Sequence, residues 1–306
     1  MLAAVLLYFS ARVVNWGRVG STIASAHWGW LAAAAGFITF SSFVRGLRWR
    51  ILLNATAYFS VGTVFWANMA GYLGNNLLPA RAGELVRSYL ISRRSSLSTT
   101  YVLTTALSER LMDVIALVLW SSLVLLGMNP KPRWMEDLSR TMAIIAGIGA
   151  VAILVLPHTG EWLEKVIEKI PMPAHPRERL IRLTHQILLG LRAFHDWKRL
   201  AGFVALTIVI WLSDAAGTMV GAHALGLEIR FPVALLLLTA LGLGSALPST
   251  PGYVGIYQFV AVNVLAPFGM SKDDAMAYIL VAQALAYIIV IGFGLPGLYQ
   301  FRREKK

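Results

Sequence analysis

The sequence predicts an all-α integral membrane protein with about six transmembrane helices and two re-entrant, broken helix hairpins. Of its 306 residues, 57% are hydrophobic and only 14% are charged, and the mean hydropathy is +0.65. Soluble domains carry roughly a quarter charged residues. Several runs approach the ~20 apolar residues that span a hydrocarbon core, and the alternation typical of membrane β-barrels is absent from the sequence.

The predicted spans follow the longest apolar runs. The first, residues 1–16, is short and has Arg12 near its end. It lacks the basic n-region and cleavage site of a secretory signal, so it is expected to be retained. The sequence leaves open whether it fully spans. The other predicted spans are residues 28–47, 97–127, 139–157, 199–222 and 275–298.

Two further apolar regions, residues 58–92 and 231–267, are interrupted by proline and glycine. Proline removes a backbone donor and glycine relaxes the backbone, so the chain can turn within a few residues. Irregular backbone survives inside a bilayer only where protein buries it or where it lines a wet cavity. Each region is therefore predicted to be a re-entrant pair of half-helices. In the first region a helix is expected to start near Gly83.

The basic residues predict an orientation. The net charge is +12, and most of the 27 Lys and Arg residues fall in residues 45–94, 158–199 and 301–306. Six crossings put both termini on this basic side, which the positive-inside tendency makes cytoplasmic. In a membrane protein this positive charge indicates that the anionic partner is the lipid headgroups and not a nucleic acid. Residues 158–199 are predicted to be a cytoplasmic amphipathic connector, either interfacial helices on the headgroups or a solvated linker.

A weak internal repeat emerges when the chain is shifted by 169 residues. This shift sets Arg45 opposite Asp214, within residues 27–46 and 196–217, and it also aligns residues 77–86 with 246–255.

The repeat predicts two halves in one membrane domain of residues 1–306, approximately 1–130 and 139–306. Three predicted crossings separate the two copies, so the halves have opposite orientations. Transporters with such inverted repeats hold their substrate near the midplane, where broken helices meet. The repeat therefore predicts a site between the two broken regions.

Several charged residues fall inside predicted spans. A charge at the centre of a membrane helix costs ~2.5–3.5 kcal/mol on translocon scales, so such residues are expected to face the bundle interior and to find partners. The residues expected to form a polar network are Arg45, Arg48, Glu109, Asp113 and Asp214.

The charges of the first broken region allow two interpretations. They could clamp the hairpin against its neighbouring helix through ion pairs. Alternatively, they could bind a headgroup, since guanidinium groups match phosphate geometry and a helix N-terminus favours an anion. On the second interpretation the predicted substrate-binding residues are Arg81, Glu84, Arg87, Arg110, Ser249, Thr250 and Tyr253.

Four segments together resemble the lysylphosphatidylglycerol synthase transmembrane family, the flippase-like membrane half of the multiple peptide resistance factor. They are "RGLRWRILL" (45–53), "GNNLLPARAGELVRSYLISRR" (74–94), "ALSERLMDVIAL" (106–117) and "ALPSTPGYVGIYQF" (246–259). The resemblance covers nearly the whole chain, in the family's order.

The resemblance implies lipid translocation in a cell membrane, namely a bacterial inner membrane. It implies an anionic phospholipid, a lipid-linked sugar or a hopanoid-like lipid as partner, and by analogy a homodimer. The chain ends at "FRREKK" without the soluble aminoacyl-transferase domain of fused members, so lipid aminoacylation is not expected. The turn "PSTPGYVG" also departs from the more glycine-rich turn of many members.

The predicted function is therefore a lipid flippase or transporter, not an enzyme, and no cofactor or metal is expected. The sequence contains no cysteine, no phosphate-binding loop, no Asp-x-Asp-type metal pair and no nucleophile–base pair. The alternatives are an integral-membrane lipid or glycolipid transferase and a non-transporting partner of a lipid-modifying enzyme. The sequence does not determine the lipid, the direction of transport or the energy source.

Overall fold

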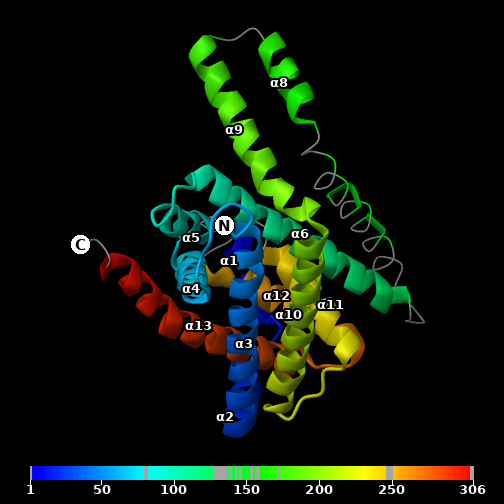
Figure 1. Ribbon diagram of the computed structural model, residues 1–306. Helices are drawn as coiled ribbons and strands as arrows, with labels where there is room; N and C mark the ends of the chain where they lie inside the picture. Colours follow the sequence, from blue (N-terminus) through cyan, green and yellow to red (C-terminus); the bar gives the residue numbers. More distant parts are fainter. Residues whose placement is uncertain are drawn as a thin grey trace.

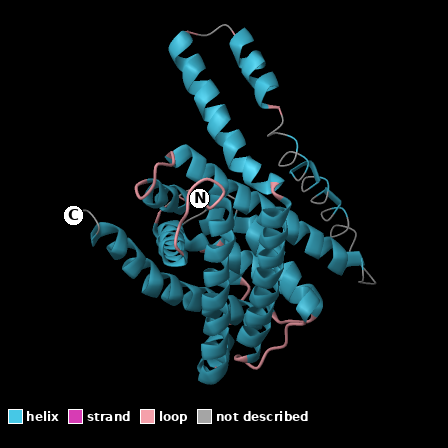
Figure 2. Cartoon of the chain, in the orientation of Figure 1, coloured by secondary structure: helices cyan, strands magenta, loops and turns pink. Residues whose placement is uncertain are grey.

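A computed structural model of the chain describes residues 2–78, 82–126, 159–170, 173–245 and 251–303, together with scattered positions between 137 and 155. These residues form helices joined by short loops, and no strand occurs among them (Figure 2). The predicted all-α membrane class is confirmed.

Helices α3 (Trp28–Leu53) and α10 (Trp197–His223) form a central antiparallel pair (Figure 1). At one end the N–H of His27 donates to the Ala224 carbonyl oxygen at 2.8 Å, and at the other end Gly202 lies against Ile51. Helices of 26 and 27 residues are about 40 Å long, more than the ~30 Å hydrocarbon core.

Three helices in the described part of the chain are long and apolar enough to cross a membrane, and these are α3, α10 and α13 (Lys272–Arg303). Helix α6 (Thr99–Leu126) is equally long but carries Glu109, Arg110 and Asp113 near its middle. These four helices cover the predicted spans 28–47, 97–127, 199–222 and 275–298, whereas 139–157 lies largely outside the described residues.

The predicted short first helix, about residues 1–16, is present, but it ends earlier than predicted. The chain forms α1 (Leu2–Arg12) and then α2 (Trp16–Ala24), because Asn15 between them is extended and its side chain accepts the N–H groups that begin α2. The 11 residues of α1 rise only about 16 Å, roughly half of the hydrocarbon core. This helix alone does not span a bilayer.

The first broken region is a tight helical hairpin of α4 (Val61–Leu77) and α5 (Gly83–Ser92). The start of α5 confirms the predicted start at Gly83. A Cβ there would lie 1.9 Å from the carbonyl oxygen of Gly71, so only glycine allows this approach. The Gly83 N–H donates to Asn75 Oδ1 at 3.0 Å. Both helices are shorter than the ~20 residues of a span. Their re-entry into the bilayer stays a prediction.

The second broken region consists of α11 (Phe231–Ser245), η4 (Pro251–Tyr253) and α12 (Ile256–Leu265), which η5 (Ala266–Phe268) follows. Positive φ angles occur at Gly252 (69°), Tyr253 (62°) and Gly255 (93°). The chain thus turns sharply before α12, and α12 packs between α11 and α13. Again each helix is shorter than a full span.

Helix α13 closes the bundle against the first broken region. A Cβ on Gly294 would lie 2.9 Å from the Met69 carbonyl oxygen, and one on Gly297 would lie 2.7 Å from that of Trp66. Small residues of this kind allow membrane helices to approach closely. The contact connects the C-terminal helix with α4 of the N-terminal half.

Helices α8 (Gly160–Lys169) and α9 (Ala174–Arg192), followed by η3 (Ala193–His195), form a hairpin that rises away from the end of the bundle (Figure 1). Its base packs on α6, where the Ser98 hydroxyl donates to Gln186 Oε1 at 2.7 Å. Both interpretations of the connector, interfacial helices and a solvated linker, stay predictions.

Candidate functional site

Eight charged side chains meet inside the bundle and neutralise one another. They come from α3, α5, α6 and α10, so one network connects both predicted halves of the chain. Its four arginines are Arg45, Arg48, Arg87 and Arg110, and its four carboxylates are Glu84, Glu109, Asp113 and Asp214.

Arg48 is the centre of this network. Its side chain is fully buried, and its guanidinium lies 2.6 Å from Asp113 Oδ1 and 2.9 Å from Glu109 Oε1. It also donates to the Thr207 hydroxyl at 3.0 Å and lies over the Phe203 ring. Arg48 therefore joins α3 to both α6 and α10. Buried charges of this kind are tolerated because each has hydrogen-bonded partners.

Arg87 connects the first hairpin to the same network. Its side chain is 1% exposed, and it donates to Glu84 Oε2 at 2.6 Å, to Glu109 Oε2 at 3.0 Å and to Asn68 Oδ1 at 2.7 Å. Arg110 then donates to Glu84 Oε1 at 3.0 Å. These contacts fasten α5 to α6 as the ion-pair interpretation expects. Binding of a headgroup by the same residues stays a prediction.

Arg45 and Asp214 form the outer pair of the network. Their nearest side-chain atoms are 2.6 Å apart, and the side chains of Arg45 and Asp214 are 14% and 18% exposed to solvent. Asp113 lies 3.6 Å from Arg45 on the other side, and the guanidinium covers the Trp211 ring. These are the two positions that the 169-residue shift sets opposite each other. The pair bridges the two helices that the repeat relates.

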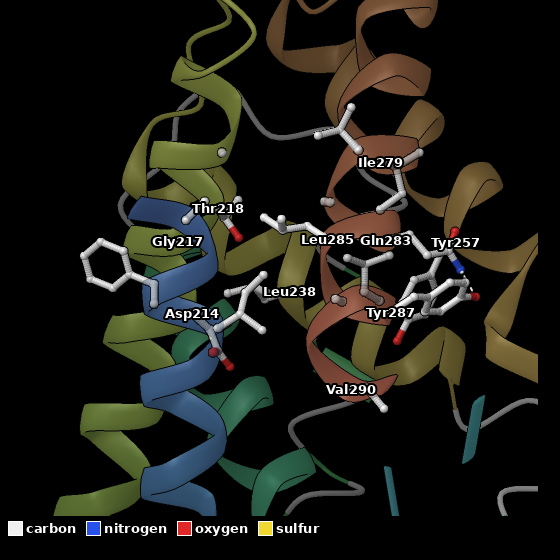
Figure 3. A pocket seen from close by; sticks show the side chains of 18 of the residues that line it. Asp214, Gly217, Thr218, Leu238, Tyr257, Ile279, Gln283, Leu285, Tyr287 and Val290 are labelled. Atoms are coloured by element: carbon white, nitrogen blue, oxygen red, sulfur yellow. Dashed lines mark hydrogen bonds between the residues drawn. The ribbon is translucent and has the colours of Figure 1, made fainter. Parts of the chain in front are cut away.

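A cavity of about 350 Å³ opens beside this pair, between α3, α10, α11 and α13 (Figure 3). Most of its wall is apolar. Asp214 lies on one side of the view, and Gln283, Tyr257 and Tyr287 lie on the other. Pockets of 300–1,000 Å³ with a few polar groups in an apolar wall are the usual form of a small-ligand site.

The predicted substrate-binding residues do not gather in this cavity. Among those that the structure describes, Tyr253 lines it, whereas Glu84, Arg87 and Arg110 belong to the charge network. Arg81, Ser249 and Thr250 lie outside the described residues. Two residues predicted for the network, Arg45 and Asp214, belong to both the network and the cavity wall.

Sequence reasoning missed a second polar cluster, on α13. Gln283 donates to the Gly252 carbonyl oxygen at 2.6 Å and to the Tyr287 hydroxyl at 2.8 Å, and it accepts from Gln258 at 2.6 Å. The Tyr287 hydroxyl also donates to Gly252. The available signal was a lone amide within the apolar run "VAQALAY", since polar residues inside membrane helices commonly mark functional sites.

Replacing Gln283 by leucine is expected to lower the free energy of unfolding by about 1–3 kcal/mol, because the buried Gln258 amide group loses its acceptor and the Gly252 carbonyl oxygen loses one of its two donors. Thermal and denaturant unfolding in detergent measure this change. The matched control is Gln300→Leu, an exposed position on the same helix, for which no loss is expected. Equal stability of the two variants would contradict the assigned role of Gln283.

The described residues contain no group of three or more His, Cys, Asp or Glu side chains placed to hold a metal ion. Each of the four carboxylates in the network contacts at least one arginine. The network is therefore built to balance charge within the protein.

The fold and site define a polytopic helical membrane protein with a buried charge network and, beside it, a largely apolar cavity that carries a few polar groups. Within this class, the chain belongs to the family of the lysylphosphatidylglycerol synthase TM region, which it matches over residues 1–294.

Curated relatives agree with this assignment. The glycosyltransferase AglD of Haloferax volcanii is 26% identical over 96% of this chain, which spans only about half (53%) of AglD. A UPF0104 membrane protein of Methanothermobacter thermautotrophicus is 23% identical, over 89% of this chain and 84% of the relative. Another, from Methanocaldococcus jannaschii, is 23% identical over 75% of this chain and 94% of the relative. These relatives support a membrane location.

Proposed function

We propose that this protein is a lipid flippase or transporter, which passes a lipid headgroup through the cavity beside α3, α10 and α13. The observation that carries the proposal is the cavity itself, about 350 Å³ in volume, with an ion pair and hydrogen-bonding side chains in an otherwise apolar wall. Polar groups are costly within a membrane and typically mark a substrate path. The acyl or isoprenoid chains of the lipid stay in the bilayer.

Movement of the two halves would expose the cavity to each side in turn. Arg45 and Asp214 come from the helices that the repeat relates, and these helices are antiparallel, as an inverted repeat requires. The pair keeps some exposure, whereas Arg48 has none. Separation of this outer pair would let α3 and α10 move apart at the cavity while the buried network keeps α3 fixed on α6.

We also propose that the basic end of the bundle is cytoplasmic. The end of α13 and the starts of α6 and α10 share this end with the basic α8–α9 hairpin, and Arg94 there donates to the Gln300 carbonyl oxygen at 3.0 Å. At the opposite end Arg18 pairs with Asp274 at 3.3 Å. Cytoplasmic loops of membrane proteins carry the excess of Lys and Arg.

Single cysteines test this orientation, since the natural chain has none. Lys198 lies at the start of α10, and Arg230 lies after the far end of α10, directly before α11; both are exposed. In intact cells, an impermeant thiol reagent is expected to label Arg230→Cys but to label Lys198→Cys only after the membrane is permeabilised. The reverse pattern would overturn the proposed orientation.

The relative AglD is named a glycosyltransferase, which supports a second candidate, a membrane-embedded transferase that acts on a lipid-linked sugar. A transferase would change the mass of the lipid, whereas a flippase moves it unchanged. Mass spectrometry of the lipids after incubation with the protein therefore separates the two candidates.

Reconstitution in liposomes tests the flippase proposal. Lipids with a fluorescent headgroup are expected to become accessible to an impermeant quenching reductant faster in protein-containing vesicles than in empty ones. If none of an anionic phospholipid, a glycosyl lipid and a polyprenyl-phosphate sugar crosses faster than in empty vesicles, the proposal is wrong.

A further inference from the structure

Two sets of polar groups around the cavity differ in whether they have hydrogen-bond partners. In the first set each group has a partner: Arg45 pairs with Asp214, and Gln283, Tyr287 and the Gly252 carbonyl group bond to one another. These groups shape the wall. Any ligand that used them would have to replace contacts that the protein already makes.

The second set has no hydrogen-bond partner within the described residues. It consists of the Asn76 amide, the Ser213 hydroxyl, the Tyr253 hydroxyl and the Trp211 indole N–H, all in the cavity wall. The indole nitrogen is fully buried, and Trp211 as a whole is only 6% exposed. Buried polar groups are nearly always hydrogen-bonded, so the indole nitrogen points to a bound molecule, and the other three groups, of which Asn76 and Tyr253 are half-buried, line the same cavity beside it.

All four of these groups are uncharged. The amide and the two hydroxyls can each donate and accept, and the indole donates. Such a set suits a ligand with several hydroxyl groups, which also donate and accept. A phosphate group only accepts hydrogen bonds, and it is best bound by a cation. In the described wall that cation is Arg45, so a phosphate would have to break the 2.6 Å ion pair of Arg45 and Asp214.

Tyr253 is held in place for contact with a ligand. Its φ angle of 62° is uncommon for a residue with a side chain, and such strain often accompanies a functional role. Its ring stacks on that of Tyr257 with centroids 5.0 Å apart and an interplanar angle of 10°. The bonds of Gln283 and Tyr287 to Gly252 fix the turn that carries it. Rigid aromatic rings beside hydroxyl and amide groups suit the apolar C–H face of a sugar ring.

We infer that the cavity recognises an uncharged, hydroxyl-rich headgroup, the chemistry of a hexosyl lipid. This inference rests on the proposed lipid transport and names the part of the lipid that enters the cavity. Asn76, Ser213, Trp211 and Tyr253 bind the hydroxyl groups, and the ion pair of Arg45 and Asp214 disfavours a bare phosphate.

Competition between two lipids tests this inference. Purified protein in a sugar-free detergent is incubated with equal amounts of monoglucosyl diacylglycerol and phosphatidylglycerol of the same acyl chains, and native mass spectrometry reads the retained lipid. The glucosyl lipid is expected to be retained at least about tenfold more. Equal retention, or a preference for phosphatidylglycerol, would overturn the inference.

Variants connect this preference to the cavity. Tyr253→Phe keeps the ring and Ser213→Ala removes only a hydroxyl, so both are expected to fold and to bring the ratio towards one. Tyr299→Phe, an exposed position at the far end of α13, is the matched control and is expected to keep the wild-type ratio. An unchanged ratio in both cavity variants would contradict the assigned residues.

Two further arms separate this inference from the proposed function. Free methyl glucoside at the concentration of the lipid is not expected to displace the glucosyl lipid, and displacement would assign the site to free sugars instead. In the liposome assay, crossing of phosphatidylglycerol without the glucosyl lipid would overturn the inference and keep the flippase. Retention of the glucosyl lipid without crossing of any lipid would support the inference and overturn the flippase.

Discussion

Replacing Arg48 by methionine is expected to lower the free energy of unfolding by about 3–5 kcal/mol, which is the usual cost of removing one partner from a buried ion pair. The substitution leaves Glu109 and Asp113 without the guanidinium that both contact at 3.0 Å or less. Arg87 and Arg45 are already bonded to other groups, so neither replaces it fully.

Chemical denaturation in detergent measures this loss, with tryptophan fluorescence as the readout. The control is Arg18→Met, which removes an exposed pair with Asp274 and is expected to cost less than about 1 kcal/mol. If both variants lose the same free energy, the charge network is not the main support of the helix bundle.

Gly83→Ala is expected to open the first hairpin and to cost about 3 kcal/mol or more, the upper part of the range for overpacked sites. The new Cβ would lie 1.9 Å from the Gly71 carbonyl oxygen and 2.6 Å from the Asn75 amide nitrogen. These are backbone atoms of α4, so the two helices themselves must separate. Glu84 and Arg87 on α5 would then move away from their partners on α6.

Hydrogen exchange checks this prediction, because amides of α4 and α5 are expected to lose protection before those of α3 and α10. Gly62→Ala, at the start of α4, meets no atom within 4 Å and is the matched control. Wild-type protection in Gly83→Ala would show that the hairpin does not depend on this contact.

The sequence predicted well those features of the fold that depend on neighbouring residues or on a regular pattern along the chain. Long apolar runs identified the spanning helices, and proline and glycine marked the two interruptions. The repeat did more, because it set Arg45 opposite Asp214 and these two side chains form an ion pair. Two positions related by an antiparallel repeat can meet where the two helices cross, so the pair that the shift aligns is also a pair in contact.

The features that the sequence could not predict depend on packing between distant segments. The eight charges offered many pairings, and only the arrangement of α3, α5 and α6 places Arg48 between Glu109 and Asp113. The position of the cavity depends in the same way on helices far apart in the chain, whereas the sequence placed its candidate site around Arg87, which stays a prediction. The break at Asn15 was missed because its cap competes with an otherwise apolar helical pattern.

If a lipid headgroup passes through the cavity beside α13, filling that cavity with a large side chain should stop lipid crossing. Ala286 lines the cavity, whereas Ala284, two residues earlier on the same helix, is exposed on another face. In reconstituted liposomes, Ala286→Trp is expected to reduce lipid crossing to the rate of empty vesicles, and Ala284→Trp is expected to keep the wild-type rate. Wild-type crossing by a stably folded Ala286→Trp variant would contradict the account.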